Sequence, residues 1–371
     1  MGIYIGLALL YLLLSFVKLE KSLNKKSKSR YIFLLLLIPF FLAAFRGIDV
    51  GNDTYTYFRM YRNVGLYSNY FNFMARTRLE PGYSLLMFGF QWLGASYEVF
   101  QVFCEAVIFL SFNKYIKRYS ENYALSCFMF VVNRNLAGTM NTMRMWLAIA
   151  IILNAIPYIK DRKLIKFLLV VLAASTMHYT ALLFVLVYLM ADIKKEKYLF
   201  PVTIVISIVI AFIGTPFFRF VTNVIGKYEG YLSTGYFDTS GAMAIYISFI
   251  INFVFIIYYT FLRQYDRGIK HFDGDSDIVS DQYIFYLMYF IAFCFSVIGL
   301  RNQIMSRVSS YFSISALSLL PFALNSSPSK SNQKMMHVII CTLLFAEFVV
   351  IMIYRPNWQG VIPYHTFFTN P

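Results

Sequence analysis

Apolar runs close to membrane-spanning length alternate with short polar segments along the chain. The first run covers about residues 2–17, and the second covers about residues 31–45. A helix needs about 20 apolar residues to cross the hydrocarbon core of a bilayer, although several runs here are shorter. Counted at that length, the pattern predicts an all-α bundle of about 12–14 transmembrane helices. We expect one integral membrane domain over residues 1–371.

Clusters of basic residues between the apolar runs predict the orientation of the chain. The densest cluster follows the first run and contains Lys18, Lys21, Lys25, Lys26, Lys28 and Arg30. Because Lys and Arg are enriched in cytoplasmic loops, this cluster predicts an N-terminus on the outer side. The second run then leads to an external loop at about residues 46–80, and a second external loop is expected at about residues 215–243.

Two apolar regions are interrupted by polar residues. Residues 164–190 lie between two basic clusters that are both expected on the cytoplasmic side, so this region must cross the membrane an even number of times. The break at 175–178 therefore predicts a tight hairpin with His178 at its outer tip. Residues 82–112 split at 94–96, and one part is expected to be re-entrant or interfacial. This region places Gln91, Glu98 and Glu105 in a protected environment.

Composition supports a polytopic membrane protein. The 371 residues are 59% hydrophobic and 14% charged, whereas a soluble domain carries about a quarter charged residues. The net charge of +15 does not indicate nucleic-acid binding, because the basic residues form the short clusters of the positive-inside pattern. Four isolated cysteines match neither a metal site nor a disulfide framework: Cys104, Cys127, Cys294 and Cys341.

Basic side chains at the predicted outer ends of spans run against the positive-inside trend. They are Arg46, Arg144, His178, Arg301 and Arg307. Arginine presents a planar fork of donors that matches phosphate and pyrophosphate. Several such forks facing one outer cavity would bind a lipid pyrophosphate and stabilise it as a leaving group. The alternative is that each arginine reaches the lipid headgroups or pairs with a nearby acid.

Three acids and one histidine are candidates for the chemistry of sugars. Asp49 and Asp53 also suit Asx turns that shape the loop, whereas Asp53 and Glu80 are the stronger candidates for binding sugar hydroxyls or acting as a general base. His178 interrupts an apolar run and is the best candidate for the base, because imidazole titrates near neutrality. Its alternative is a structural histidine.

The chain carries no motif that indicates a metal or a cofactor. The segment Asp273-Gly-Asp275-Ser-Asp277 is similar to a calcium loop, but Ile278 and Ile284 stand where that loop needs Gly and Glu. A solvated loop is the better interpretation. Phosphate-binding loops, dinucleotide fingerprints and nucleophile elbows do not occur in the sequence. We therefore expect no metal and no cofactor.

Six motifs follow one another over nearly the whole chain. They are Phe45-Arg-Gly-Ile-Asp-Val-Gly-Asn-Asp-Thr-Tyr55, Glu80-Pro-Gly-Tyr83, Thr142-Met-Arg-Met-Trp-Leu-Ala148, Ser175-Thr-Met-His-Tyr-Thr-Ala-Leu182, Arg307-Val-Ser-Ser-Tyr-Phe312 and Asn357-Trp-Gln-Gly-Val-Ile-Pro-Tyr364. In this order they resemble the EpsG/Wzy-type polysaccharide polymerase family of bacterial inner membranes. The family usually has Gln after the arginine matched by Arg144, and here Met145 stands in that place. Any role of that Gln is absent or supplied elsewhere.

The resemblance implies a metal-independent membrane glycosyltransferase. Such an enzyme polymerises undecaprenyl-pyrophosphate-linked repeat units into O-antigen, capsule or exopolysaccharide, on the outer face of the bacterial cytoplasmic membrane. The implied fold is that of the GT-C-like membrane glycosyltransferases with lipid-linked donors. The expected catalytic residues are His178, Glu80 and Asp53, and the expected contacts to pyrophosphate and sugar are Arg46, Arg144, Arg301, Arg307, Tyr311 and Asp49. The expected partners are the lipid-linked substrate, the bilayer, and a chain-length regulator and a flippase of the same pathway.

Two other functions remain open. A flippase or transporter of the same lipid would show internal repeats and polar residues through the midplane of the membrane. The concentration of charge at one face favours chemistry at the surface instead. A ligase or single-addition glycosyltransferase with the same donor needs the same clamp on the leaving group, so the sequence does not separate it from a polymerase.

Overall fold

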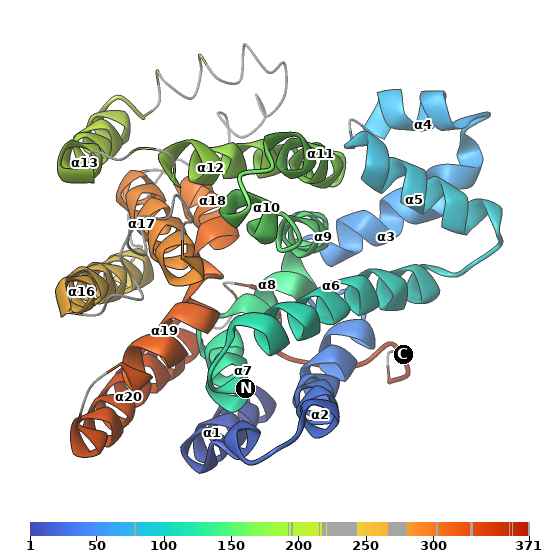
Figure 1. The fold of residues 1–371 in the computed structure, drawn as a ribbon. Coiled ribbons are helices and arrows are strands. Elements are labelled where there is room, and N and C mark those ends of the chain that lie inside the picture. The colour runs from blue at the N-terminus through green and yellow to red at the C-terminus, as the bar shows by residue number, and fades with distance from the viewer. Residues whose placement is uncertain are drawn as a thin grey trace. The chain divides into compact units, whose positions relative to one another are not determined.

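The computed structural model of the chain is all-helical in the part that it describes (Figure 1). The described residues are 1–77, 79–191, 193, 196–214, 216, 220, 243–265, 280–301, 303–326, 329–355, 357 and 359–369. Within them the only β-type pairing is an isolated bridge between Arg46 and Thr366, so the predicted all-α class is confirmed. Nearly all of the predicted external loop at 215–243, and the segment 273–277, lie outside the described residues.

The described chain divides into two compact units. Unit 1 comprises Met1–Tyr158, Arg162–Leu183 and Leu320–Pro371, and unit 2 comprises Ile159–Asp161 and Phe184–Leu319. The single domain expected from the sequence stays a prediction.

Most of the helices belong to unit 1. They are α1 (Gly2–Val17), η1 (Leu19–Lys21), α2 (Lys25–Ala44), α3 (Thr54–Arg62), η2 (Asn63–Leu66), α4 (Tyr70–Thr77), α5 (Pro81–Trp92), α6 (Tyr97–Tyr119), α7 (Tyr123–Val132), α8 (Asn135–Asn141), α9 (Met143–Ile152), α11 (Leu164–Ser175) and α20 (Lys330–Tyr354). Helices α10 (Ile156–Lys160) and α19 (Ala316–Asn325) and the 3-10 helix η3 (Tyr179–Phe184) extend across the boundaries between the units. Unit 2 contains α12 (Val185–Ala191), α13 (Glu196–Phe212), α16 (Met243–Tyr265), α17 (Asp281–Gly299) and α18 (Gln303–Ser313).

Six helices among the described residues are long and apolar enough to cross a membrane, which makes the chain a multi-pass membrane protein. These candidate spans are Gly2–Lys21, Lys25–Ala44, Tyr97–Tyr119, Ile245–Leu262, Asp281–Gly299 and Lys330–Tyr354. A seventh arises if Met305–Ser313 and Ala316–Asn325, bent by 50°, form one span. The structure therefore contains fewer full-length spans than the expected count of about 12–14.

The difference arises because several apolar runs form helices that are too short to cross. Five of them have 10–17 residues: Tyr123–Val132, Met143–Ile152, Leu164–Ser175, Tyr179–Ala191 and Tyr198–Phe212. At 1.5 Å per residue, the 12 residues of α11 reach about 18 Å, against about 30 Å for the hydrocarbon core. The positions of the breaks were nevertheless predicted: residues 93–96 separate α5 from α6, and residues 176–178 separate α11 from η3.

The interior of unit 1 is built around α7 and α9. Helix α7 is buried along its whole length and packs against α1, while α6 packs against both α2 and α9, and α9 packs against α11 (Figure 1). Helices α1, α2 and α20 instead expose large apolar side chains such as Leu13, Leu34 and Leu343. An apolar outer surface of this kind suits contact with lipid.

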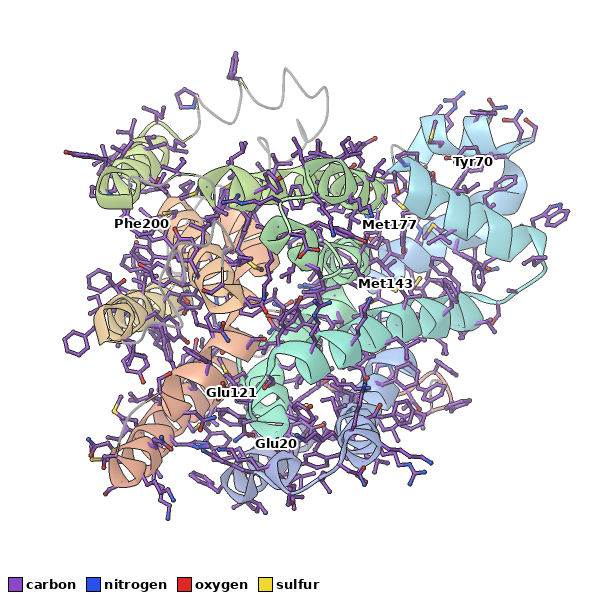
Figure 2. The ribbon with its side chains drawn as sticks, in the orientation of Figure 1. Glu20, Tyr70, Glu121, Met143, Met177 and Phe200 are labelled. Atoms are coloured by element: carbon purple, nitrogen blue, oxygen red, sulfur yellow. The ribbon has the colours of Figure 1, made fainter. Side chains whose placement is uncertain are left out.

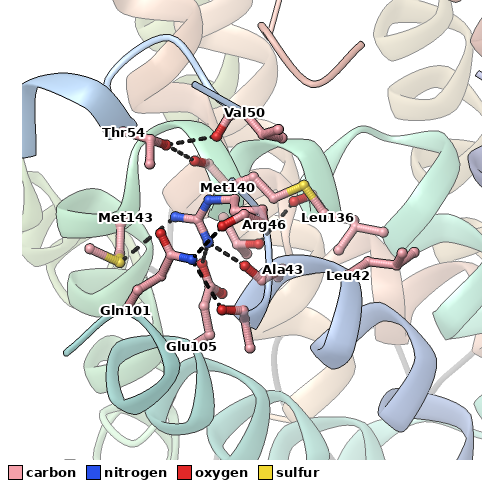
Figure 3. Close-up of polar contacts among 12 residues, drawn as sticks. Leu42, Ala43, Arg46, Val50, Thr54, Gln101, Glu105, Leu136, Met140 and Met143 are labelled. Carbon is pink, nitrogen blue, oxygen red and sulfur yellow. Dashed lines mark hydrogen bonds and ion pairs between the residues drawn. The ribbon is translucent and has the colours of Figure 1, made fainter. Parts of the chain in front are cut away.

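The carbonyls at the end of α2 accept hydrogen bonds from two polar side chains (Figure 3). The Arg46 guanidinium donates through Nη1 to the carbonyl of Ala43, and Gln101 Nε2 donates to the carbonyls of Ala44 and Arg46, each at 3.0 Å. The last carbonyls of a helix have no partner within the helix. Arg46 and Gln101 supply those partners and so fix how the chain leaves α2.

The charge of Arg46 is neutralised by an acid from α6. Arg46 Nη1 lies 2.7 Å from Glu105 Oε1, and both side chains have no exposed surface (Figure 3). A buried ion pair is weak evidence for net stability, but removing one partner leaves an uncompensated charge in an apolar interior. The pair therefore makes the joint between α2 and α6 dependent on both residues.

The C-terminal tail holds the turn that follows Arg46. The amide of Gly47 donates to the carbonyl of His365 at 3.0 Å, and Phe367 N donates to Phe45 O at 3.1 Å. Gly51 adopts φ +100°, which favours glycine, and its amide donates to Gly360 O at 2.7 Å. Residues 360–367 thus form a strap across residues 45–51.

We predict that Glu105→Gln destabilises the protein by about 3–5 kcal/mol, because it leaves the Arg46 charge buried without a counter-ion. Thermal unfolding of the detergent-purified chain measures the change. Glu98→Gln is the matched control, since Glu98 lies on the same helix and is only half-buried. Equal melting temperatures for the Glu105→Gln and Glu98→Gln variants would contradict the role assigned to the pair.

Candidate functional site

Glu80, Arg144 and His178 form one charged cluster in unit 1. Glu80 Oε2 accepts from Arg144 Nη1 at 2.5 Å, and Glu80 Oε1 lies 2.8 Å from His178 Nδ1. The Glu80 side chain is 2% exposed, whereas Arg144 is 23% and His178 is 17% exposed. One buried carboxylate thus holds two partners that both reach the surface of the unit.

The start of α5 positions Glu80. Pro81 occupies the first position of the helix, and Glu80 before it is extended, with φ −66° and ψ 145°, as the residue before a proline prefers. The amides of Gly82 and Tyr83 donate to the carbonyl of Thr176 at 2.9 and 3.2 Å. The first turn of α5 is therefore bound to the end of α11, which places Glu80 beside His178.

Arg144 and His178 come from two elements that pack together. Arg144 lies in the first turn of α9, and His178 follows α11 by three residues. Figure 2 labels Met143 and Met177, the residues that precede Arg144 and His178, on α9 and just after α11. Because α9 packs against α11, Arg144 and His178 both lie next to the carboxylate of Glu80.

Two tyrosine rings hold the guanidinium of Arg144. Its Cζ atom lies 5.4 Å from the centroid of the Tyr57 ring and 5.9 Å from that of Tyr83, and its Nε donates to the Tyr57 hydroxyl at 3.4 Å. Both rings are buried. Burial raises the pKa of Tyr57 to about 12, so this phenol stays neutral. Arg144 is thus fixed on one side while part of its surface remains open.

The cluster determines the charge of Glu80 and the tautomer of His178. Burial acts to raise the pKa of Glu80, but the hydrogen bond from His178 and the charge of Arg144 outweigh it and lower the pKa to about 2. The carboxylate is therefore ionised at neutral pH and only accepts hydrogen bonds. His178 Nδ1 must then donate to it, which leaves the lone pair of a neutral imidazole on Nε2.

Asp53 lies at the edge of this cluster. It precedes the first residue of α3, is half-buried, and stands four residues before Tyr57, whose pKa its negative charge helps to raise. Its backbone amide donates to Asn141 Oδ1 at 3.3 Å. The structure therefore brings four of the sequence-predicted site residues into one region of unit 1: Asp53, Glu80, Arg144 and His178.

Two other predicted site residues of unit 1 have structural partners. Asp49 is 59% exposed and pairs with Nε2 of His365 in the C-terminal strap. Arg46, expected to contact pyrophosphate, has no exposed surface and pairs with Glu105. The Arg46 guanidinium is thus paired with an acid in this structure, and its contact to pyrophosphate stays a prediction. The sequence did not identify Glu105 as that acid, because the two residues are 59 positions apart.

The remaining predicted site residues belong to unit 2. Arg301 is exposed, and its guanidinium lies over the ring of Phe212, 5.8 Å from the centroid. Arg307 is half-buried on α18, and Tyr311 lies one turn further along the same helix and is 1% exposed. Their assignment to substrate binding stays a prediction.

Sequence reasoning missed Tyr57 and Tyr83. Both could have been found in the sequence. Tyr83 ends the Glu80-Pro-Gly-Tyr83 motif, and Tyr57 follows Asp53 by four residues, a spacing that places two side chains on the same face of a helix. Across the part of the chain that the structure describes, no group of three His, Cys, Asp or Glu side chains is arranged as metal ligands would be.

The helical fold and the buried charged cluster define a multi-pass membrane protein with a polar site inside an apolar unit. A comparison with protein-family models matches the EpsG family over residues 4–366, and the chain therefore belongs to the EpsG family. Membership suggests a role in exopolysaccharide synthesis. Searches of curated proteins and of solved structures find no match to this chain.

We predict that Glu80 makes part of the stability dependent on pH. A pKa lowered from 4.5 to about 2 stabilises the folded state by an amount on the order of 3 kcal/mol. This contribution is complete above about pH 4.5 and is lost as the pH falls from there through about 2. Thermal unfolding between pH 7 and pH 3 should show a smaller acid-induced decrease for Glu80→Gln than for wild type. Glu98→Gln serves as the control, and a Glu80→Gln profile parallel to wild type would refute the assignment.

Gly82→Ala tests the junction between α5 and α11. A Cβ atom at Gly82 would lie 2.3 Å from Thr176 Oγ1 and 2.6 Å from Met177 Cε, so the junction must open. We expect a loss of about 1–3 kcal/mol in stability, measured by thermal unfolding. Gly89→Ala on the same helix is the control, because a Cβ there meets nothing within 4 Å. Similar stabilities of the two variants would show that the junction tolerates displacement.

Proposed function

We propose that this protein is a membrane glycosyltransferase that polymerises undecaprenyl-pyrophosphate-linked oligosaccharide units on the outer face of the bacterial cytoplasmic membrane. The observation that carries the proposal is the cluster of Glu80, Arg144 and His178, in which an oriented imidazole and a fixed guanidinium share one buried carboxylate. Membership of the EpsG family supports the link to polysaccharide synthesis.

The proposed reaction transfers a growing chain from its lipid carrier to the terminal sugar of an incoming unit. The acceptor hydroxyl oxygen bonds to the anomeric carbon of the donor, and the bond from that carbon to the pyrophosphate oxygen breaks. The bonding electrons leave with the lipid pyrophosphate, and the hydroxyl proton passes to a base. The site must therefore supply a proton acceptor and stabilise a negative leaving group.

His178 is the proposed base. Its Nδ1 donates to Glu80, so Nε2 is the atom that accepts the proton of the acceptor hydroxyl. The imidazolium that forms is stabilised by the adjacent carboxylate, as in other catalytic pairs of histidine and carboxylate. Glu80 accordingly orients His178 rather than acting as the base itself, because its low pKa makes it a weak proton acceptor.

Arg144 is the proposed ligand of the leaving pyrophosphate. One of its Nη atoms binds Glu80 and its Nε binds Tyr57, while its Nη2 atom makes no hydrogen bond among the described residues. Arginine stays protonated at all physiological pH values, so Nη2 offers a permanent charge-assisted donor to a phosphate oxygen. Asp53 is proposed to bind a sugar hydroxyl at the edge of the same cluster.

Further contacts to the substrate are proposed for unit 2, through Arg301, Arg307 and Tyr311. The orientation with the site outside follows from the basic clusters of the sequence, which favour the cytoplasmic side. A chain-length regulator and a flippase of the same pathway are the proposed partners.

The test uses purified protein in detergent micelles with lipid-linked repeat units, where no transport across a membrane is needed. We expect His178→Ala to lower the rate of polymerisation by about 10²–10⁴-fold while the protein stays folded, because the step loses its general base. Arg144→Lys should also lower the rate, since lysine lacks the planar fork. Arg59→Lys is the control, because Arg59 is an exposed residue of α3 outside the cluster.

Three results would reject parts of the proposal. Full-length ladders of polymer from His178→Ala would remove His178 as the base. Two observations together would instead indicate a flippase. The purified wild-type protein would form no polymer in micelles, and deletion of the gene would make lipid-linked units accumulate on the inner leaflet. A product with one added unit only would indicate a ligase or single-addition enzyme.

A further inference from the structure

A pocket in unit 1 lies apart from the Glu80 cluster in the chain. Its polar lining comes from Arg134, Arg355 and Gln359, and its remaining walls are mostly apolar, with Tyr4 and Phe348 among them. The cavity has a volume of about 20 Å³, which admits one small polar group. We refer to it as the Arg355 pocket.

The Arg355 pocket carries excess positive charge. Arg134 Nη1 lies 2.9 Å from Glu347 Oε1, so the charge of Arg134 already has a counter-ion. Arg355 Nη1 is buried and has no hydrogen-bond partner among the described residues. The described lining of the pocket thus contains two guanidinium groups and no carboxylate. A buried donor of a charged group without an acceptor is costly, so an anionic oxygen at this point would complete the pocket.

The position of the pocket in the fold indicates where such an anion comes from. Arg355 directly follows α20, and Tyr4 lies in the first turn of α1, and both helices are candidate membrane spans. The two ends meet, because the Tyr4 hydroxyl donates to the carbonyl of Val361 at 3.1 Å. The ends of spans lie at the depth of lipid headgroups. The pocket therefore opens where phosphate groups of lipids are concentrated.

We propose that the Arg355 pocket binds the phosphate group of a membrane lipid. The fork of Arg355 donates to the phosphate oxygens, Arg134 adds a second positive charge, and the apolar walls contact the first carbons of the lipid chain. Arginine and phosphate form strong charge-assisted hydrogen bonds of matching geometry. The lipid is either a phospholipid of the bilayer or a polyprenyl phosphate, since both present the same group on an apolar chain.

The pocket is connected to the candidate active site through hydrogen bonds. Gln359, which lines the pocket, accepts through Oε1 from Asn141 Nδ2 at 2.7 Å. Asn141 Oδ1 in turn accepts from the amide of Asp53 at 3.3 Å, at the start of α3. Helix α3 carries Tyr57, which holds Arg144. The pocket and the cluster are therefore joined through the start of α3.

The experiment measures lipid binding to the full-length, delipidated protein by native mass spectrometry. The probes are phosphatidylglycerol, undecaprenyl phosphate, diacylglycerol as the lipid without phosphate, and inorganic phosphate. We expect one phosphate-bearing lipid to bind more tightly than diacylglycerol and inorganic phosphate. Arg355→Gln should weaken this binding by about tenfold or more, because a charge-assisted contact is lost. Arg59→Gln, at an exposed arginine outside the pocket, should leave it unchanged.

A second variant keeps both arginines. Ala137→Leu narrows the pocket, since Ala137 is part of its lining, and should weaken lipid binding without changing the charge. This variant decides the question if Arg355→Gln fails to fold, as judged by size-exclusion chromatography. Binding that depends on Arg355 for phosphatidylglycerol identifies a bilayer lipid, and the same dependence for undecaprenyl phosphate alone identifies a polyprenyl carrier. Lipid binding that neither substitution weakens, or inorganic phosphate that binds as tightly as the lipids, would overturn the proposal.

Discussion

A carboxylate buried in an apolar bundle is stabilised by a cation beside it, and two such pairs of unit 1 fix the path of the chain. Glu105 on α6 pairs with Arg46 at the end of α2, and Glu80 before α5 pairs with Arg144 on α9. Each pair joins segments that are far apart in the chain. Since an unpaired charge in such an interior is costly, the paths of the chain after α2 and before α5 both depend on these contacts.

The two pairs differ in how much of their surface is exposed, and in this structure only the exposed pair can contact a ligand. Arg46 and Glu105 have no exposed surface, and the Arg46 guanidinium also donates to the carbonyl of Ala43. Glu80 is equally well buried, but its partners Arg144 and His178 keep part of their surface open. A sealed pair can only hold helices together. An open pair also presents a fixed cation and an oriented imidazole to a ligand.

The sequence predicted the class of fold, and it named four residues that the structure brings together in unit 1, because both depend on local patterns. Apolar runs located the helices, and polar breaks located the turns at 93–96 and 176–178. Among the described residues, fewer helices reach full span length than expected, because apolar runs between polar breaks were counted as crossings although a helix such as α11 has only 12 residues. The burial of Arg46 could not be predicted from the sequence, because its partner Glu105 is determined by how α2 packs against α6.

The C-terminal segment contacts parts of the chain that support the Glu80 cluster. Gly360 and His365 hold the turn after Arg46, while Gln359 reaches Asn141 and, through it, the start of α3. The hydrogen bonds of this segment therefore determine where Asp53 and Tyr57 stand. Because Tyr57 orients Arg144, the geometry of the cluster depends on this tail. The lipid site proposed at the Arg355 pocket lies on the same tail, at the point where it leaves α20.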